Sequence, residues 1–256
     1  MTIYEAIYKR KSVRKYTSET ISTFHREHID HFMDCATCLH PTIPIAYEIV
    51  TRKEDGDRIG LKTNVKAPQY LVFYTKIEPG CYENAGYILE QCVLYMTTKG
   101  IGSCYIGRNF IEPNKDYTNQ GYEMCITLAF GYPLEDVFQK ERKIERMDLK
   151  KLYVVKDGSD NRMLPCIESA RLAPSGLNLQ PCRYVIYQNR LHIFIRLNKL
   201  SEKLFLSMNH INAGIAICHI ILSAEEQWGD PQYFKSSLIE ERSLNKHLYI
   251  GSVQLN

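Results

Sequence analysis

Residues 83–107 read ENAGYILEQCVLYMTTKGIGSCYIG, and this stretch decides how the rest of the chain is interpreted. Apolar side chains recur along it at the spacing of one helix face, namely at Ile88, Leu89, Cys92, Val93 and Met96. The pattern predicts a helix over 83–99 that ends at Gly100. The small residues of 100–107 allow the helix end and a short strand to approach each other closely. They do not form a dinucleotide-binding fingerprint, because their spacing differs and because they follow a helix instead of opening one.

Similar elements precede and follow this helix in the first half of the chain. Helical periodicity predicts helices over 2–11 and 22–38. Runs rich in β-branched and aromatic residues predict strands over 47–51, 70–74 and 124–130. The first half therefore mixes helices and strands along the chain.

The second half repeats this order. A helix that begins near Met163 is followed by strands over 183–187 and 191–195, and then by a long helix that includes 213–227. This last helix matches the first half's helix in place and character. The repeat predicts an α+β fold of two related halves, packed as a pseudo-dimer within one chain.

Composition and charge limit the classes of function that fit this chain. The chain has 256 residues, of which 45% are hydrophobic and 24% charged, as in soluble globular proteins. A formal net charge of +3 gives no support for broad nucleic-acid binding. We find no apolar run near the roughly 20 residues of a membrane span and no apolar signal-peptide core. Nine scattered cysteines favour reduced thiols. We expect a cytoplasmic protein that binds neither nucleic acid nor a membrane.

The first candidate motif is 9–15, which reads KRKSVRK and holds five cations in seven positions. Arginine forks and a hydroxyl supply the charge and the donors that a phosphate needs. In a continuous helix Arg10 and Arg14 share a face while Ser12 points away, so the chain must leave the helix near Lys11 for the three to converge. The alternative is a solvated helix end whose cations complement the helix dipole. Local features favour this alternative.

The second candidate motif is 173–181, which reads APSGLNLQP and lies between a predicted helix and a predicted strand. Two prolines bracket a loop of polar residues. An amide side chain both donates and accepts hydrogen bonds, so Asn178 could address the edge of a heterocycle. An ordinary Pro/Gly/Asn turn remains the alternative.

Other motifs are excluded. Cys35, Cys38 and His40 miss the haem-attachment spacing, and no second cysteine pair stands at the spacing of zinc ligands. The eight histidines form no H-E-x-x-H pair, and no G-x-S-x-G elbow is present. The sequence therefore predicts no metal site and no hydrolase triad.

Together, four segments resemble the FMN-dependent nitroreductase family: 7–16, 100–107, 131–133 and 173–181. Typical members carry the basic motif and the loop close together in one subunit, and two subunits form two FMN sites across their interface. Here the loop follows the basic motif by about 160 residues, and neither half holds both motifs. The chain thus resembles a single-chain, internally duplicated branch that keeps one site, which implies one FMN per chain.

The resemblance assigns each half a part of that site. Domain 1–150 would carry the phosphate-binding basic motif, and domain 151–256 the flavin loop. The residues implied to bind the FMN phosphate and ribityl chain are Arg10, Lys11, Ser12 and Arg14, together with Arg146. Those implied to lie along the isoalloxazine ring are Pro174, Ser175, Gly176 and Asn178 from the loop, together with Cys104, Ile106 and Gly107.

By resemblance the chain is an NAD(P)H-dependent FMN oxidoreductase. Electrons would pass from NAD(P)H through FMN to a nitroaromatic, a quinone or a similar acceptor. The flavin carries the chemistry, so no side chain is implied as catalytic. The alternative is a flavin-binding or sensing protein without turnover. The expected form is a monomer, itself a pseudo-dimer, or a weak homodimer.

Overall fold

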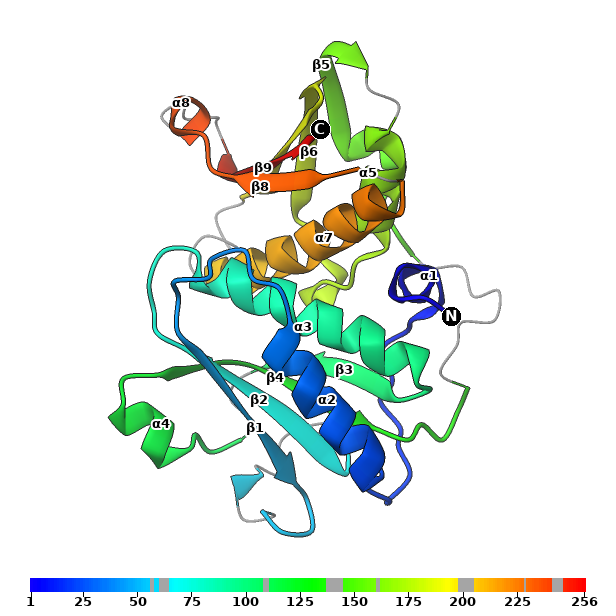
Figure 1. The fold of residues 1–256 in the computed structure, drawn as a ribbon, viewed down its shortest axis with the longest axis vertical. Helices are drawn as coiled ribbons and strands as arrows, with labels where there is room; N and C mark the ends of the chain where they lie inside the picture. The colour runs from blue at the N-terminus through cyan, green and yellow to red at the C-terminus, as the bar shows by residue number, and fades with distance from the viewer. Residues whose placement is uncertain are drawn as a thin grey trace. The chain divides into compact units, whose positions relative to one another are not determined.

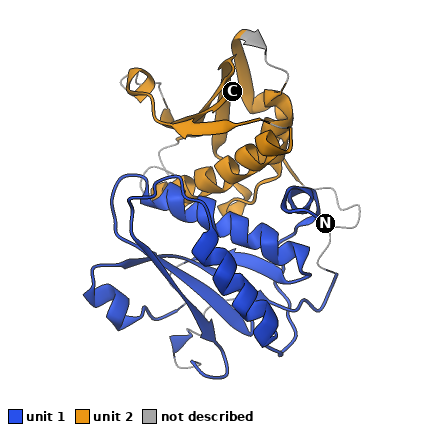
Figure 2. Cartoon of the chain, in the orientation of Figure 1, with its two compact units in different colours: residues 1–142 blue, residues 143–256 orange. Residues whose placement is uncertain are grey.

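The computed structural model of the chain describes residues 1–55, 58–59, 65–107, 111–136, 145–159, 162–197, 205–227, 229–240 and 246–256. The chain forms two compact units, Met1–Arg142 and Lys143–Asn256, which Figure 2 shows in different colours. The domain boundary expected at residue 150 lies inside the 3-10 helix η3 (Leu149–Lys151) of the second unit. The units are therefore described with the boundary at 142.

Unit 1 is built on one antiparallel sheet with the strand order β1-β2-β4-β3 (Figure 1). Helix α3 packs on this sheet, and α1 and α2 pack against α3. The elements of unit 1 are α1 (Ile3–Lys9), α2 (Thr23–Cys35), β1 (Ile45–Thr51), β2 (Gln69–Thr75), α3 (Cys81–Thr98), β3 (Gly102–Ile106), α4 (Lys115–Asn119) and β4 (Glu123–Gly131).

The core of unit 1 forms around β2, whose seven residues are all buried. Tyr70, Val72 and Tyr74 belong to one apolar cluster that also holds Val13 and Ala129. The residues between them point to the opposite face, because side chains alternate along a strand. A strand buried on both faces reads as a continuous apolar run, which is why the sequence made β2 easy to predict.

Helix α3 ends as the sequence predicts. Gly100 takes the left-handed conformation, with a φ of +72°. Its N–H donates to the Thr97 carbonyl at 3.1 Å, and the Ile101 N–H donates to the Met96 carbonyl at 3.0 Å. These two bonds form a Schellman cap, which favours glycine at this position. The cap turns the chain directly into β3.

Unit 2 has its own mixed sheet, with the strand order β5-β6-β7-β9-β8 (Figure 1). Strand β5 runs parallel to β6, and the other neighbours are antiparallel. Helix α7 packs against α5 and against the sheet. The elements of unit 2 are η3, β5 (Tyr153–Ser159), α5 (Met163–Leu172), the 3-10 helix η4 (Gly176–Asn178), β6 (Cys182–Gln188), β7 (Arg190–Arg196), α7 (Leu206–Glu226), β8 (Pro231–Phe234), α8 (Ser237–Glu240) and β9 (His247–Leu255).

The two units share one topology. The antiparallel order β6-β7-β9-β8 of unit 2 repeats the order β1-β2-β4-β3 of unit 1. In both units a helix comes before the first strand of this set, α2 before β1 and α5 before β6, and a longer helix connects its second strand to its third. The expectation of an α+β fold with two related halves is confirmed, and β5 is an addition at the edge of the second sheet.

Helix α7 corrects one expectation. The sequence analysis found no apolar run of membrane-span length, yet α7 has 21 residues and passes that test by length and composition. Within its most apolar stretch, 72% of the residues are buried in the structure. A helix that is apolar on most sides is typical of the core of a large unit. Its burial against α5 and the sheet explains its composition.

Candidate functional site

The basic motif leaves the helix where the sequence analysis required it to. A capping box between Thr2 and Glu5 begins α1, and the helix ends at Lys9. Arg10 is extended, with φ −64° and ψ 144°. In an extended segment side chains two residues apart point to the same side, which places Arg10, Ser12 and Arg14 together. The predicted helix over 2–11 is therefore two residues too long at its end.

Backbone contacts with β3 and β4 hold this segment in place. Ser12 forms a parallel bridge with Ser103 of β3, and the Val13 N–H donates to the Ser103 carbonyl at 2.9 Å. Val13 is buried, and the Tyr16 hydroxyl donates to its carbonyl at 2.6 Å. The motif is thus fixed on the sheet of unit 1 instead of lying free at a helix end.

Arg10 is the unusual residue of this motif, because only 7% of it is exposed. Its Nη2 donates to the Ser12 hydroxyl at 3.1 Å. Its Nε is buried and has no hydrogen-bond partner, and no ion pair to Arg10 occurs in the described part of the chain. A buried charge without a partner is costly, and native structures pair such groups almost always. The arrangement fits an anion that completes the site.

Arg10 and Arg14 both act electrostatically on the Cys104 thiol. Burial raises the pKa of the Cys104 thiol, and the positive charges of Arg14 and Arg10 oppose that rise. Both guanidinium groups therefore lie near the thiol, although Arg14 is exposed and Arg10 is not. The structure thus brings together Arg10, Ser12, Arg14 and Cys104, and Lys11 lies half-exposed between them along the chain.

Cys104 and Ile106 point into the core. Both belong to the apolar cluster that contains Val13, and both are less than 9% exposed. Gly107 follows β3 and is exposed. Of the three residues of this segment that were predicted to lie along the flavin ring, Gly107 is thus the one that is open to solvent.

Gly102 gives a test of how closely the motif and β3 must approach. A Cβ atom on Gly102 would lie 2.7–2.9 Å from the Val13 side chain, which real Cβ contacts do not show. We expect Gly102→Ala to lower the free energy of unfolding by about 1–3 kcal/mol, measured by urea denaturation. The double variant Gly102→Ala/Val13→Ala is the control, since it removes the two colliding methyl groups and leaves only the Cβ of residue 13 at 2.9 Å. It is compared with Val13→Ala alone, which shows the cost of losing the buried methyl groups. A Gly102→Ala protein as stable as the wild type would show that the packing is looser than described.

In unit 2 the predicted loop is held in an unusual backbone conformation. Leu177, Asn178 and Gln180 all have positive φ, at 53°, 55° and 46°. For residues other than glycine each such conformation costs about 1–3 kcal/mol when the surroundings must impose it. The loop also leaves the Leu177 side chain 77% exposed. Strain and an exposed leucine on one loop exceed what an ordinary turn requires.

Hydrogen bonds from both sides impose this conformation. The Asn178 Oδ1 accepts from Arg146 Nη1 at 2.7 Å, and its Nδ2 donates to the Glu145 carbonyl at 3.0 Å. The Gln180 Oε1 accepts from the Met147 N–H at 2.7 Å. Two residues that the sequence analysis assigned separately, Arg146 and Asn178, are therefore direct partners. Part of the Asn178 amide is already used within unit 2.

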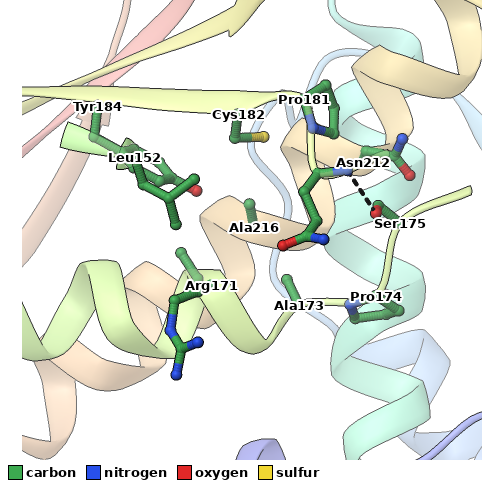
Figure 3. Close-up of a pocket in the computed structure, with 12 residues that line it drawn as sticks. Leu152, Arg171, Ala173, Pro174, Ser175, Pro181, Cys182, Tyr184, Asn212 and Ala216 are labelled. Atoms are coloured by element: carbon green, nitrogen blue, oxygen red, sulfur yellow. Dashed lines mark hydrogen bonds between the residues drawn. The ribbon is translucent and has the colours of Figure 1, made fainter. Parts of the chain in front are cut away.

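The loop also forms part of a small pocket of about 20 Å³ (Figure 3). Pro174 and Ser175 line it from the loop, Leu152 and Tyr184 from the strand side, and Asn212 from α7. In Figure 3 these side chains surround a common space. The pocket thus lies wholly within unit 2.

Asn212 is a residue that the sequence analysis missed. Its Oδ1 accepts from the Gly176 N–H at 3.0 Å, and its Nδ2 is buried without a hydrogen-bond partner. The sequence did hold a sign of its role, because Asn212 is an amide in an otherwise apolar helix and buried polar groups are normally hydrogen-bonded. Within the described ranges, no three His, Cys, Asp or Glu side chains gather as metal ligands would.

A comparison with protein families now decides what kind of protein this is. A family model described as "Putative TM nitroreductase" matches residues 2–224. The chain belongs to this nitroreductase family. The resemblance expected from the motifs is thereby confirmed. No curated protein shows significant sequence similarity to the chain.

One solved structure with a TM-score above 0.5 confirms the fold of this nitroreductase-family chain. A protein described as a putative nitroreductase from Thermotoga maritima has 21% identity and a TM-score of 0.67, over 100% of this chain and 93% of the other. A nitroreductase family protein from Clostridium difficile 630 has 17% identity and a TM-score of 0.49, over 59% of this chain and 96% of the other. An FMN-dependent nitroreductase from Clostridium difficile R20291 has 17% identity and a TM-score of 0.44, over 55% of this chain and 93% of the other.

Proposed function

We propose that this nitroreductase-family chain binds one FMN and passes electrons from NAD(P)H through it to a small acceptor such as a nitroaromatic or a quinone. Membership of the family supports an oxidoreductase function. The observation that carries the cofactor is Arg10, a buried guanidinium whose Nε has no partner. A phosphate monoester supplies the charge and the acceptor oxygens that such a group lacks.

The phosphate end of FMN is assigned to unit 1. Arg10 would bind the phosphate through its free N–H groups, while its bond to Ser12 keeps the guanidinium fixed. Arg14, which is exposed, and Lys11, which is half-exposed, would add positive charge from the solvent side. A donor set that is fixed before the ligand arrives loses less entropy on binding.

For the ring end of FMN we keep the residues that the family resemblance implies, which are those of the loop of unit 2 and Gly107. Pro174, Ser175 and Gly176 are fixed by the contacts around Asn212 and Gln180. The loop holds Leu177 exposed, and Leu179 is 44% exposed. Apolar side chains held out by a strained loop suit a flat ring that covers them. Asn178, with Arg146 behind it, would face the polar edge of the ring, and Gly107 offers backbone without a side chain.

The protein's contribution to the reaction is binding and orientation. FMN, when bound, accepts a hydride from the nicotinamide and returns electrons to the acceptor. The cations of the basic motif fix the phosphate and so the position of the whole cofactor. The buried Cys104 thiol has a raised pKa, so it stays neutral near this group and adds no repulsion to the phosphate.

The test is the visible spectrum of freshly purified protein, with released flavin counted per chain. We expect yellow protein with about one FMN per chain, and loss of the flavin colour when NADH or NADPH is added without oxygen. Bound flavin that neither nucleotide reduces would favour a sensing protein without turnover. Colourless protein that also fails to bind added FMN would overturn the proposal.

A further inference from the structure

A second, cationic site lies in unit 2 beside the loop pocket, with which it shares Leu152 and Tyr184. Its cavity has a volume of about 830 Å³, counting the space at its mouth. Four permanently charged side chains line it, together with His247; they are Lys151, Arg183, Arg196 and Lys246. These residues come from η3 and from the ends of β6, β7 and β9, which lie in one sheet (Figure 1).

The charges of this cavity are not balanced. No aspartate or glutamate is among the described residues that line it. None of its four cations makes an ion pair with a described residue. The whole chain carries a formal net charge of only +3, so four cations around one hollow, with no acidic side chain among the described residues that line it, are a local concentration. Such a concavity focuses positive potential and attracts anions.

Arg183 is fixed at the wall of this cavity. Its Nη1 donates to the carbonyl of Gln180 at 2.9 Å and to the carbonyl of Cys182 at 2.6 Å. Its Nε and Nη2 make no hydrogen bond to a described residue. Burial lowers the pKa of Arg183, and the neighbouring positive charge of Arg196 lowers it further. Arg183 and Arg196 thus line the same hollow, and no described aspartate or glutamate lines it with them.

The β6–β7 hairpin and β9 keep the other cations beside Arg183. Arg196 pairs with His247 in the register of β7 and β9. The Leu197 N–H donates to the Lys246 carbonyl at 2.8 Å, and Lys246 itself has a φ of +62°. These backbone contacts hold like charges together, which costs free energy unless an anion lies between them.

We propose that this cavity is a binding site for a small molecule with a multivalent phosphate group. A concave site suits a small ligand, whereas nucleic acids and membranes need an extended basic face. Fixed arginine forks match phosphate oxygens, and four cations favour a group that carries two or more negative charges. The site lies on unit 2 and contains no residue assigned to FMN, so it does not depend on the proposed function.

The experiment measures binding of inorganic pyrophosphate to the full chain by isothermal titration calorimetry. The Arg10→Ala variant is the protein used, so that the FMN phosphate site does not contribute. We expect one pyrophosphate per chain, and about tenfold or greater weakening in Arg183→Gln and in Arg196→Gln. Arg196 is exposed, so its variant keeps the test valid if Arg183→Gln fails to fold.

The matched control is Lys156→Gln, which removes one exposed cation from β5 outside the cavity. We expect it to change pyrophosphate affinity less than twofold, roughly the effect of a distant surface charge. Equal weakening in all three variants would overturn the site, because it would indicate diffuse attraction. No measurable pyrophosphate binding would overturn it as well. Citrate binding as strong as pyrophosphate binding would overturn the phosphate class.

Discussion

Replacing Arg10 by alanine is expected to weaken FMN binding by about 10- to 100-fold. Hydrogen bonds to charged groups contribute about 1.5–3 kcal/mol each, and about 1.4 kcal/mol corresponds to a factor of ten. Arg10 has free donors and is already fixed by Ser12, so its loss removes a prepared contact. Fluorescence titration of the apoprotein with FMN measures the change.

The same substitution is expected not to destabilise the apoprotein. A buried guanidinium without a carboxylate partner opposes folding, so its removal relieves a cost. Urea denaturation of apo Arg10→Ala should therefore give a midpoint equal to or above that of the wild type. Lower flavin affinity together with undiminished stability distinguishes a ligand-binding arginine from a structural one.

Two variants serve as controls for Arg10. Arg10→Lys keeps the charge but loses the planar fork, and we expect an affinity between those of the wild type and of the alanine variant. Lys15→Ala removes a cation whose side chain is 75% exposed and whose pairing to Glu135 at 3.8 Å is weak. We expect it to change FMN affinity less than twofold, as is typical of exposed charges. If Lys15→Ala weakens binding as much as Arg10→Ala, the assignment to Arg10 is wrong.

The elements predicted from the sequence are those with a strong apolar period. The helix around Ile88 and the strand around Val72 are buried, and their patterns gave their position within a few residues. Strand β9 went unpredicted because Gly251 and Ser252 interrupt its apolar pattern. The reason for Gly251 is tertiary: a Cβ there would lie 2.5 Å from the Tyr233 ring. No local pattern carries that information.

Tertiary contacts also explain why α2 is shorter than expected. The pattern extended it to Cys38, whereas it ends at Cys35. Asn84 of α3 accepts hydrogen bonds from the N–H groups of Leu39 and His40, and the Gln91 side chain bonds to Thr37. Side chains 40 or more residues away in sequence thus take the backbone groups that a longer helix would have used.

For the candidate site too, part of the arrangement could be predicted from the sequence and part depends on tertiary contacts. Residue chemistry made Arg10, Ser12 and Arg14 candidates for binding a phosphate, but local features favoured a solvated helix end, and only the family resemblance assigned these residues to FMN. What the sequence could not show is that Arg10 is buried, since a run of cations reads as solvated surface. The direct pairing of Arg146 with Asn178 was equally hidden, because 32 residues separate them in the chain.

A partly buried carboxylate network in unit 1 carries the second large prediction. Glu48 of β1 accepts from Arg58 Nη2 at 2.7 Å and from Nη1 at 3.1 Å. The buried Tyr74 hydroxyl of β2 donates to it at 2.6 Å, and Asn114 Nδ2 donates at 3.1 Å. We expect Glu48→Ala to lower the free energy of unfolding by about 3 kcal/mol, because it leaves a partly buried arginine and a buried hydroxyl without their acceptor.

Urea denaturation near pH 7 measures this loss, with Arg26→Ala as the control. That variant removes an ion pair to Asp30 in which both side chains are 36% exposed, and such a pair contributes about 0.5 kcal/mol. A Glu48→Ala protein within about 1 kcal/mol of the wild type would show that the network contributes little net stability.

The contribution of Glu48 should also depend on pH in one direction. Burial raises the pKa of Glu48, but the hydrogen bonds from Arg58, Tyr74 and Asn114 outweigh burial and hold the pKa below its ordinary value of 4.5. A carboxylate with a lowered pKa in the folded state stabilises fully above the unfolded pKa, and this stabilisation is lost as pH falls through the folded pKa. Glu48→Gln does not titrate, so its stability difference from the wild type should shrink as the pH falls below about 4.5. A difference that stays constant down to pH 3 would show that the charge of Glu48 is not what stabilises unit 1.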